Sequence, residues 1–219
     1  MDRDFWHARW RDNEIGFHQP DFNPWLVKYW PTLGLPSDAD VFVPLCGKSR
    51  DLLWLLERGH RVQGIELADV AIEAYFAEQS IDSERGERGR FRCYRGPQIE
   101  LLCGDFFELT ANHLNTPQAV FDRAALIALP EKLRVRYADH LLRIIPDGEQ
   151  ILLVTLEYPQ EQVQGPPFSV LPEEVTIHFE ERCSITRLAS VATSTLPPKF
   201  AAGGVNEAVE SIYHITKDR

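Results

Sequence analysis

Two residues in the first third of the chain have the types and the spacing of a nucleoside-binding site. Gly47 stands in a short turn, and Glu66 ends an apolar run 19 residues later (66 − 47 = 19). In a βαβ unit, a glycine at the tip of the first strand lets the backbone approach a ligand. A carboxylate at the tip of the second strand accepts hydrogen bonds from ribose hydroxyls. The pair therefore predicts a site for a ribose-containing ligand.

The turn at residues 44–48 differs from a dinucleotide-binding loop. It has one glycine where the G-x-G-x-x-G fingerprint has three, so it is too bulky to cradle a pyrophosphate on exposed backbone N–H groups. A nucleoside without phosphates fits better, and S-adenosylmethionine is such a ligand. An ordinary α/β turn with a solvated Glu66 is the alternative interpretation.

The elements that must position these two residues are visible in the apolar pattern. Residues 41–43 and 62–66 are short apolar runs typical of buried strands. Gly59 suits the position just after a helix C-terminus. The helix between the runs has one leucine-rich face: Leu52, Leu53, Leu55 and Leu56.

Charged residues also follow two later strands, expected at 99–103 and 119–121. Asp105 follows the first strand, and the pair Asp122-Arg123 follows the second. Open α/β sheets bind ligands at the carboxyl ends of their strands, so both places are candidate sites. Asp105 suits a helix cap equally well. A local ion pair is the alternative for Asp122 and Arg123, although the end of a strand favours a site.

The remaining elements complete an α/β pattern. Residues 82–92 carry interleaved acids and bases and are expected to form a loop. A helix is expected to open at Pro130. Residues 151–156 form the most continuous apolar run, typical of a central parallel strand.

The last fifty residues predict a helix and a closing strand pair. Residues 172–180 alternate like a strand but begin with Pro-Glu-Glu, and we choose a helix. Residues 183–191 and 209–215 are expected to form an antiparallel pair on a mostly parallel sheet.

The N-terminal segment, residues 1–36, is rich in aromatic side chains. Four of the five tryptophans lie in it: Trp6, Trp10, Trp25 and Trp30. These rings either cover one face of the sheet or form a lid over a planar, cationic ligand, and both interpretations stay open. We expect a single domain over residues 1–219, with a Rossmann-like core at 37–219.

Composition excludes several functional classes. The chain is 44% hydrophobic and 26% charged, and its net charge of −10 argues against binding to nucleic acid or an anionic membrane. No run of 18 apolar residues and no signal-peptide pattern is present in the sequence. The four scattered cysteines predict buried free thiols and a cytoplasmic protein.

Seven stretches, in order from residue 5 to residue 170, carry a resemblance to a known family. They are Phe5-Trp-His-Ala-Arg-Trp10, Ile15-Gly-Phe-His18, Val43-Pro-Leu-Cys-Gly-Lys-Ser49, Gly64-Ile-Glu-Leu67, Cys103-Gly-Asp-Phe-Phe107, Asp122-Arg-Ala-Ala-Leu-Ile-Ala-Leu-Pro130 and Gly165-Pro-Pro-Phe-Ser-Val170. Together they resemble the bacterial thiopurine S-methyltransferases over nearly the whole chain.

The resemblance implies a fold and an activity. The fold is the Rossmann-like fold of S-adenosylmethionine-dependent methyltransferases: a seven-stranded, mostly parallel sheet with an antiparallel last strand and helices on both faces. The activity is S-methylation of thiopurines and other aromatic or heterocyclic thiols, by direct in-line transfer that leaves S-adenosyl-L-homocysteine. A monomeric enzyme of detoxification, acting on small molecules, is expected.

The resemblance also implies site residues. It assigns cofactor contacts to the strand tips and to the aromatic segment: Trp10, Leu45, Gly47, Glu66, Gly104, Asp105, Phe106 and Arg123. Phe17 and Phe168 would line the acceptor side. Arg123 would act in catalysis by holding the cofactor carboxylate or by favouring an anionic acceptor. No metal is expected, and no dedicated base is expected because acidic heteroaromatic thiols supply much of their own thiolate.

Two departures from the family and two alternatives remain. Ser211 stands where the family usually has an arginine, and basic residues usual near Asn206 are missing, so the wall of the acceptor pocket is expected to differ. The true acceptor is alternatively a selenium or tellurium compound. A non-catalytic protein that binds a nucleoside or S-adenosylmethionine is the alternative from another class.

Overall fold

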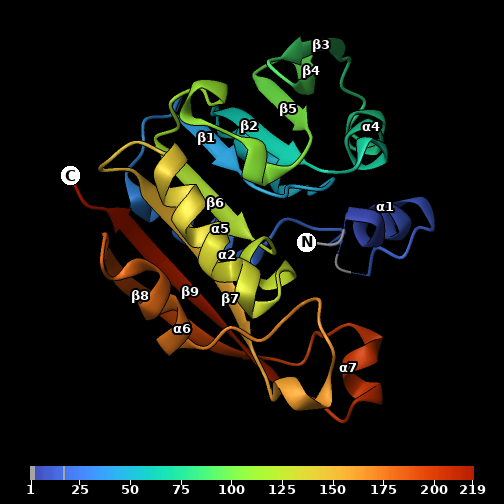
Figure 1. Ribbon diagram of the computed structural model, residues 1–219, viewed down its shortest axis with the longest axis vertical. Coiled ribbons are helices and arrows are strands. Elements are labelled where there is room, and N and C mark those ends of the chain that lie inside the picture. Colours follow the sequence, from blue (N-terminus) through green and yellow to red (C-terminus); the bar gives the residue numbers. More distant parts are fainter. Residues whose placement is uncertain (1–2, 17) are drawn as a thin grey trace.

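A nine-stranded mixed sheet organises the chain in the computed structural model, which describes residues 3–16 and 18–219. From edge to edge, the strands of the described residues are β3 (Glu84–Arg88), β4 (Phe91–Gly96), β5 (Ile99–Cys103), β2 (Arg61–Glu66), β1 (Asp40–Val43), β6 (Ala119–Arg123), β7 (Gln150–Glu157), β9 (Ala208–Lys217) and β8 (Cys183–Thr193). Figure 1 shows this sheet running through the molecule.

Five neighbouring strands form a parallel block, and both sides of that block are antiparallel. The strands β5, β2, β1, β6 and β7 are parallel. The last strand, β9, lies antiparallel between β7 and β8, as the family resemblance implied. As expected, β7 lies inside the sheet and is parallel to β6, while its other neighbour, β9, is antiparallel to it.

The two strands beyond the expected seven come from a hairpin. Residues 82–92, expected to be a loop, contribute β3 and the start of β4, which pair antiparallel. Gly89, with φ of +60°, makes the tight connection. The charged pattern concealed these strands because an edge hairpin exposes most of its side chains, while Phe91 is buried beneath them.

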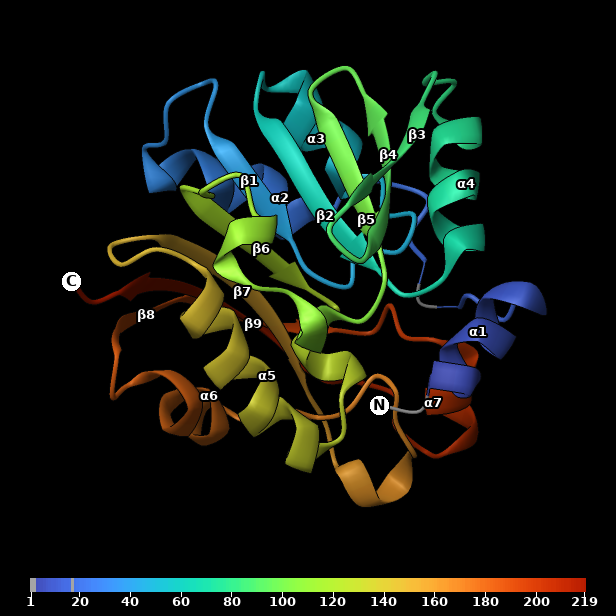
Figure 2. The ribbon, with the colours of Figure 1, turned by 45° about the horizontal axis from the view of Figure 1, so that its top comes forward.

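Helices cover both faces of the sheet. The helices α2 (Pro24–Tyr29), α3 (Asp51–Glu57) and α4 (Asp69–Glu78) bury apolar side chains on one face. The helices α5 (Glu131–Ile144) and α6 (Pro172–Phe179) cover the other, and Figure 2 shows them in front of the sheet with α2 and α3 behind. The helix predicted over 172–180 is therefore confirmed as α6.

Two further helices lie near the carboxyl ends of the parallel strands. They are α1 (Arg3–Arg11) and α7 (Pro198–Ala202), which overlap in the view of Figure 2 but lie apart in Figure 1. Trp10 of α1 packs with Ala68, Ala71 and Ile15 in a small cluster separate from the main core. Short 3-10 turns connect other elements: Trp30–Leu33, Phe106–Glu108, Ala111–His113, Leu126–Ala128 and Gln160–Gln162.

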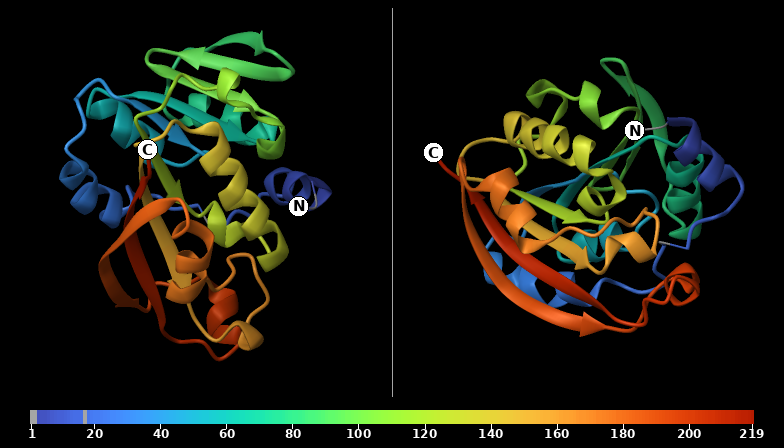
Figure 3. Two further views of the ribbon diagram at one scale, coloured as in Figure 1. Left: turned by 60° about the vertical axis from the view of Figure 1, so that its left-hand side comes forward. Right: turned by 60° about the horizontal axis from the view of Figure 1, so that its bottom comes forward.

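Two further observations concern the whole described chain. All four cysteines are buried and free, as predicted. Within residues 3–16 and 18–219, no helix combines the length and apolar character that crossing a bilayer requires. Figure 3 shows the C-terminus on one side of the molecule and α1 on the other.

Candidate active site

A cavity of about 430 Å³ opens at the carboxyl ends of β1, β2, β6 and β7. Residues from α1 and from the segment before α7 also line it. This is the edge at which parallel α/β sheets bind ligands. Five of the predicted site residues line the cavity: Trp10, Leu45, Gly47, Glu66 and Arg123.

Glu66 is buried at the cavity wall and is held by backbone donors. Its Oε2 accepts a hydrogen bond of 3.0 Å from the backbone N–H of Gly47, and its Oε1 accepts one of 2.9 Å from Ala68. Burial raises the pKa of Glu66 to about 6, although these backbone donors act in the opposite direction. The carboxylate is thus fixed in place and poorly solvated, so additional hydroxyl donors would stabilise its charge.

The backbone beside Glu66 is in a sparsely populated conformation. Gly47 has φ of +53°, and a Cβ at this position would lie 2.9 Å from Cζ2 of Trp10. Leu45 and Ala124, at the tips of β1 and β6, also have positive φ, of +47° and +66°. Such strain in residues with side chains is concentrated at functional sites.

Arg123 projects into the middle of the cavity. In the described part of the chain, no group forms a hydrogen bond or an ion pair with its guanidinium. Burial lowers its pKa, while the charges of Asp51 and Glu210 favour the protonated form. Its donors are therefore directed to the cavity and remain available to a ligand.

The charge of Asp51 favours the protonated form of Arg123. Its buried carboxylate accepts a hydrogen bond of 2.7 Å from the backbone N–H of Asn23 and one of 3.0 Å from Ser49 Oγ. Burial raises the pKa of Asp51, with Arg123 acting against this shift. Sequence reasoning missed Asp51, which gave no signal other than an acid in the first turn of a helix.

Glu210 is the second site residue that sequence reasoning missed. It extends from β9 into the cavity wall, and its Oε2 accepts a hydrogen bond of 2.8 Å from Trp25 Nε1. The only signal in the sequence is an acidic residue inside the apolar pattern 209–215. Nothing local indicates that this strand reaches the site.

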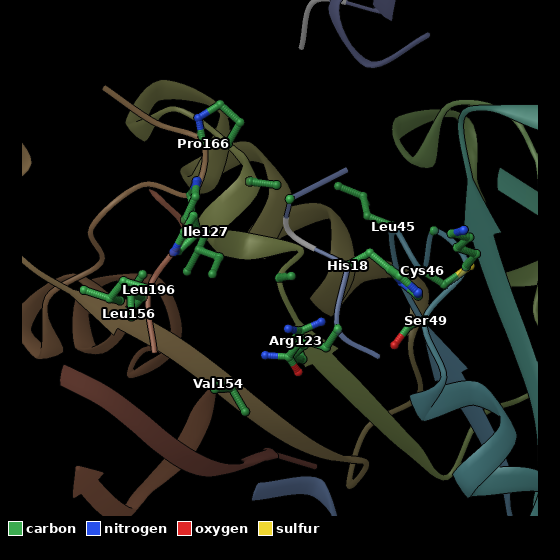
Figure 4. Close-up of a pocket in the computed structure, with 18 of the residues that line it drawn as sticks. His18, Leu45, Cys46, Ser49, Arg123, Ile127, Val154, Leu156, Pro166 and Leu196 are labelled. Carbon is green, nitrogen blue, oxygen red and sulfur yellow. The ribbon is translucent and has the colours of Figure 1, made fainter. Parts of the chain in front are cut away.

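The two sides of the cavity differ in character. Figure 4 shows Arg123 between His18 and Ser49 on one side and a group of apolar side chains on the other: Ile127, Val154, Leu156 and Leu196. An apolar wall of this kind excludes water from a planar ligand. The cavity thus combines a polar half near Glu66 with a dry half near β7.

The residues after β5 lie outside the cavity lining. Asp105 caps the following 3-10 turn, accepting a hydrogen bond of 2.9 Å from Phe107 N–H. Phe106 is buried against the ring of Tyr137. Gly104 donates its N–H to the carbonyl of Glu66. Contact of this turn with an adenine ring stays a prediction.

Of the two residues expected on the acceptor side, the structure describes only Phe168. Phe168 is absent from the lining of the described cavity; its backbone N–H donates to Ile127, and its ring packs on Gly165. It lines a neighbouring shallow cleft that also contains Glu157. Phe17 lies outside the described residues.

Asp122 and Ser211 face away from the cavity. The local ion pair considered for Asp122 and Arg123 does not form, because Asp122 accepts a hydrogen bond of 2.6 Å from Tyr137 on the α5 side. Ser211 is fully buried and its Oγ donates to Glu157. Ser211 therefore gives no direct basis for a change in acceptor binding.

Comparison with known sequences extends over the full length of the chain. The sequence model of the thiopurine S-methyltransferase (TPMT) family matches residues 1–218. A thiopurine S-methyltransferase of Pseudomonas fluorescens is 45% identical over 99% of this chain and 98% of its own length. The thiopurine S-methyltransferase of Nitrosospira multiformis is also 45% identical, with 97% of each chain covered.

Solved structures share the fold at low sequence identity. The 1,6-didemethyltoxoflavin-N1-methyltransferase of Burkholderia thailandensis, solved with bound 1,6-didemethyltoxoflavin and S-adenosylhomocysteine, has a TM-score of 0.67 at 15% identity. The match covers 99% of this chain and 87% of that chain. The magnesium protoporphyrin IX methyltransferase of Synechocystis, with bound S-adenosylhomocysteine, has a TM-score of 0.65 at 13% identity and covers 98% and 97%. The fold is therefore the Rossmann-like methyltransferase fold.

Proposed function

The chain belongs to the thiopurine S-methyltransferase family, and from this premise we propose that it methylates sulfur with S-adenosyl-L-methionine as the donor. The acceptors are thiopurines and other aromatic or heterocyclic thiols, and the product of the donor is S-adenosyl-L-homocysteine. The observation that carries the proposal is one cavity in which Glu66 and Arg123 stand on the polar side of an apolar wall.

The residues present fit the cofactor. Each oxygen of Glu66 receives one backbone hydrogen bond, which leaves lone pairs for two ribose hydroxyls. A volume of about 430 Å³ lies within the range of small-molecule sites. Trp10 and Leu45 would hold the nucleoside and the amino-acid part beside the turn. When bound, the cofactor supplies an electrophilic methyl group on a sulfonium.

The chain's own residues would perform three tasks in the reaction. Arg123 would hold a carboxylate of the cofactor or favour the thiolate form of the acceptor by its charge. The apolar side chains near β7 would keep water away from a reaction in which charge is neutralised. The cavity as a whole would align the acceptor sulfur with the methyl carbon at roughly 3–3.5 Å.

Transfer of labelled methyl tests this proposal. We expect thiophenol to be methylated far faster than phenol, because a phenol keeps its proton at neutral pH and is a harder nucleophile. Equal rates on the two acceptors would contradict S-methylation. Cofactor binding without transfer to any thiol would indicate the non-catalytic alternative.

We also propose that the protein acts as a cytoplasmic monomer on small molecules and not on nucleic acid. The net charge of −10 and the four buried free thiols support this proposal. Light scattering of the purified protein tests the monomer, and a mass of two or more chains would contradict it.

A further inference from the structure

Two oppositely charged side chains flank β7, the strand that carries Val154 and Leu156 of the apolar cavity wall. The strands β6, β7 and β9 are neighbours in that order. Arg123 on β6 pairs with Val154, and Glu210 on β9 pairs with Leu156. Since Val154 and Leu156 are two residues apart on one strand, all four side chains lie on the same face of the sheet.

The spacing of the strands sets the distance between the backbones that carry Arg123 and Glu210. Neighbouring strands are about 4.8 Å apart, so the backbones of β6 and β9 are separated by roughly 10 Å. A flat heterocycle resting on Val154 and Leu156 would therefore have Arg123 at one edge and Glu210 at the other. The bound heterocycle would thus have a hydrogen-bond donor at one edge and a hydrogen-bond acceptor at the opposite edge.

The carboxylate of Glu210 is oriented and only half used. Trp25 Nε1 donates to Oε2 at 2.8 Å, and the indole lies on α2 against the same face of the sheet. Among residues 3–16 and 18–219, no donor binds Oε1 and no cation lies within ion-pair distance of Glu210. Oε1 is thus left for a group inside the cavity.

The expectation that no base is needed applies to heterocyclic thiols that are ionised, but not to all heterocyclic thiols. Many exist as thiones with a proton on the ring nitrogen, and that proton must be lost when sulfur is methylated. We propose that Glu210 is the general base that accepts the ring N–H proton of such acceptors, an inference that rests on the proposed function. Acidic aryl thiols, which are already ionised, do not need this base.

The step balances. The ring N–H bond breaks, its proton passes to Oε1 of Glu210, and its electron pair forms the ring C=N bond. The π electrons of the C=S bond form the new bond from sulfur to the methyl carbon, while the old carbon–sulfonium bond breaks and leaves its pair on the departing sulfur. Glu210 ends neutral and releases its proton to solvent after the product leaves.

The Glu210→Gln variant tests the proposal on two acceptors. With 2-mercaptopyridine, which carries a ring N–H, methyl transfer should fall by about 10²-fold, the typical contribution of a general base. With 4-nitrothiophenol, ionised at neutral pH, transfer should stay within about twofold of the wild-type rate. Glu207→Gln, an exposed acid on the segment before β9, is the matched control and should change neither rate.

Equilibrium binding gives a second readout that needs no methyl transfer. In calorimetry without cofactor, Glu210→Gln should lower the affinity for 2-mercaptopyridine by about 5- to 10-fold, because a charge-assisted hydrogen bond is lost. The affinity for the 4-nitrothiophenolate anion should stay the same or rise, because the substitution removes a like charge. If Glu210→Gln does not fold, Glu210→Asp, which keeps the base but shortens its reach, should show the same acceptor-dependent loss to a smaller degree.

The outcomes separate this inference from the proposed function. Equal losses on both acceptors, or no loss on either, would overturn the role of Glu210 as a base. A wild-type protein that methylates neither thiol would overturn the proposed function itself.

Discussion

The backbone N–H of Gly47 donates a hydrogen bond of 3.0 Å to Oε2 of Glu66, so the turn after β1 holds the carboxylate at the end of β2. The ring of Trp10 packs on the other side of this turn. A glycine with positive φ, a buried acid and an aromatic ring therefore form one unit at the cavity. Disturbing any one of them should affect cofactor binding before it affects the sheet.

Replacing Glu66 by alanine should weaken binding of S-adenosylmethionine by about 1–3 kcal/mol, the scale of losing charge-assisted hydrogen bonds to two hydroxyls. Calorimetry with S-adenosylhomocysteine measures the loss. Glu73→Ala, on the exposed side of α4, is the matched control and should leave affinity unchanged. An unaltered affinity in a folded Glu66→Ala variant would contradict the ribose contact.

Affinity for the cofactor should depend on pH through the same carboxyl group. In the free protein burial raises the pKa of Glu66 to about 6. Hydroxyl donors favour the ionised form, so the pKa in the complex is lower and binding releases a proton. Affinity is therefore full above pH 6 and falls as the pH drops through 6.

Folding stability should respond to pH in the opposite direction. The pKa of Glu66 in the folded protein lies above its unfolded value of 4.5, so its contribution to folding stability is fully present below pH 4.5 and lost as the pH rises through 6.

The proton released on cofactor binding tests the assignment to Glu66. Calorimetry of binding in two buffers of different ionisation enthalpy measures it. A Glu66→Gln variant that releases as many protons on binding would rule this assignment out.

Replacing Gly47 by alanine should destabilise the turn by about 1–2 kcal/mol, the cost of left-handed backbone for a residue with a Cβ. The new Cβ would also press on Trp10, 2.9 Å away, so cofactor affinity should fall together with stability. Thermal unfolding and calorimetry give the two values. Gly16→Ala is the control, since nothing lies within 4 Å of a Cβ there; an equal effect of both changes would count against the role of the turn.

Deleting residues 1–18 should leave a folded sheet with sharply reduced turnover. Trp10 belongs to a small cluster with Ala68 and Ala71, outside the two large clusters that cover the sheet. Its removal opens the cavity wall without emptying the core. Circular dichroism and a methyl-transfer assay measure the two effects. A chain that unfolds outright would show that this segment is a structural cover and not a lid.

Replacing Arg123 by lysine should lower the methyl-transfer rate by roughly 10- to 100-fold, the scale of losing hydrogen bonds to a charged group. Lysine keeps the charge but cannot present two parallel donors. Arg58→Lys, on the exposed end of α3, is the control for the chemical change alone. Full activity in Arg123→Lys would mean that only charge at this position matters.

Local features of the sequence were enough to predict where Gly47 and Glu66 lie in the fold. Gly47 and Glu66 belong to one βαβ unit, in which chain neighbours determine both the turn and the strand tip. Helical periodicity likewise predicted α3 and α5, whereas the Pro-Glu-Glu start at residue 172 predicted α6 against a strand-like alternation. These predictions hold because short-range backbone geometry controls them.

The tertiary structure decided the rest. Glu210 reaches the cavity only because β9 inserts between β7 and β8, and Asp51 comes near Arg123 only because α3 packs on the face of the sheet that Arg123 occupies. Ser211 lies on the face of the sheet opposite to Glu210, because successive side chains of a strand point to opposite faces and the register fixes which face each one takes. Strand order and register depend on hydrogen bonds and packing between segments far apart in the chain, and local periodicity contains no record of them.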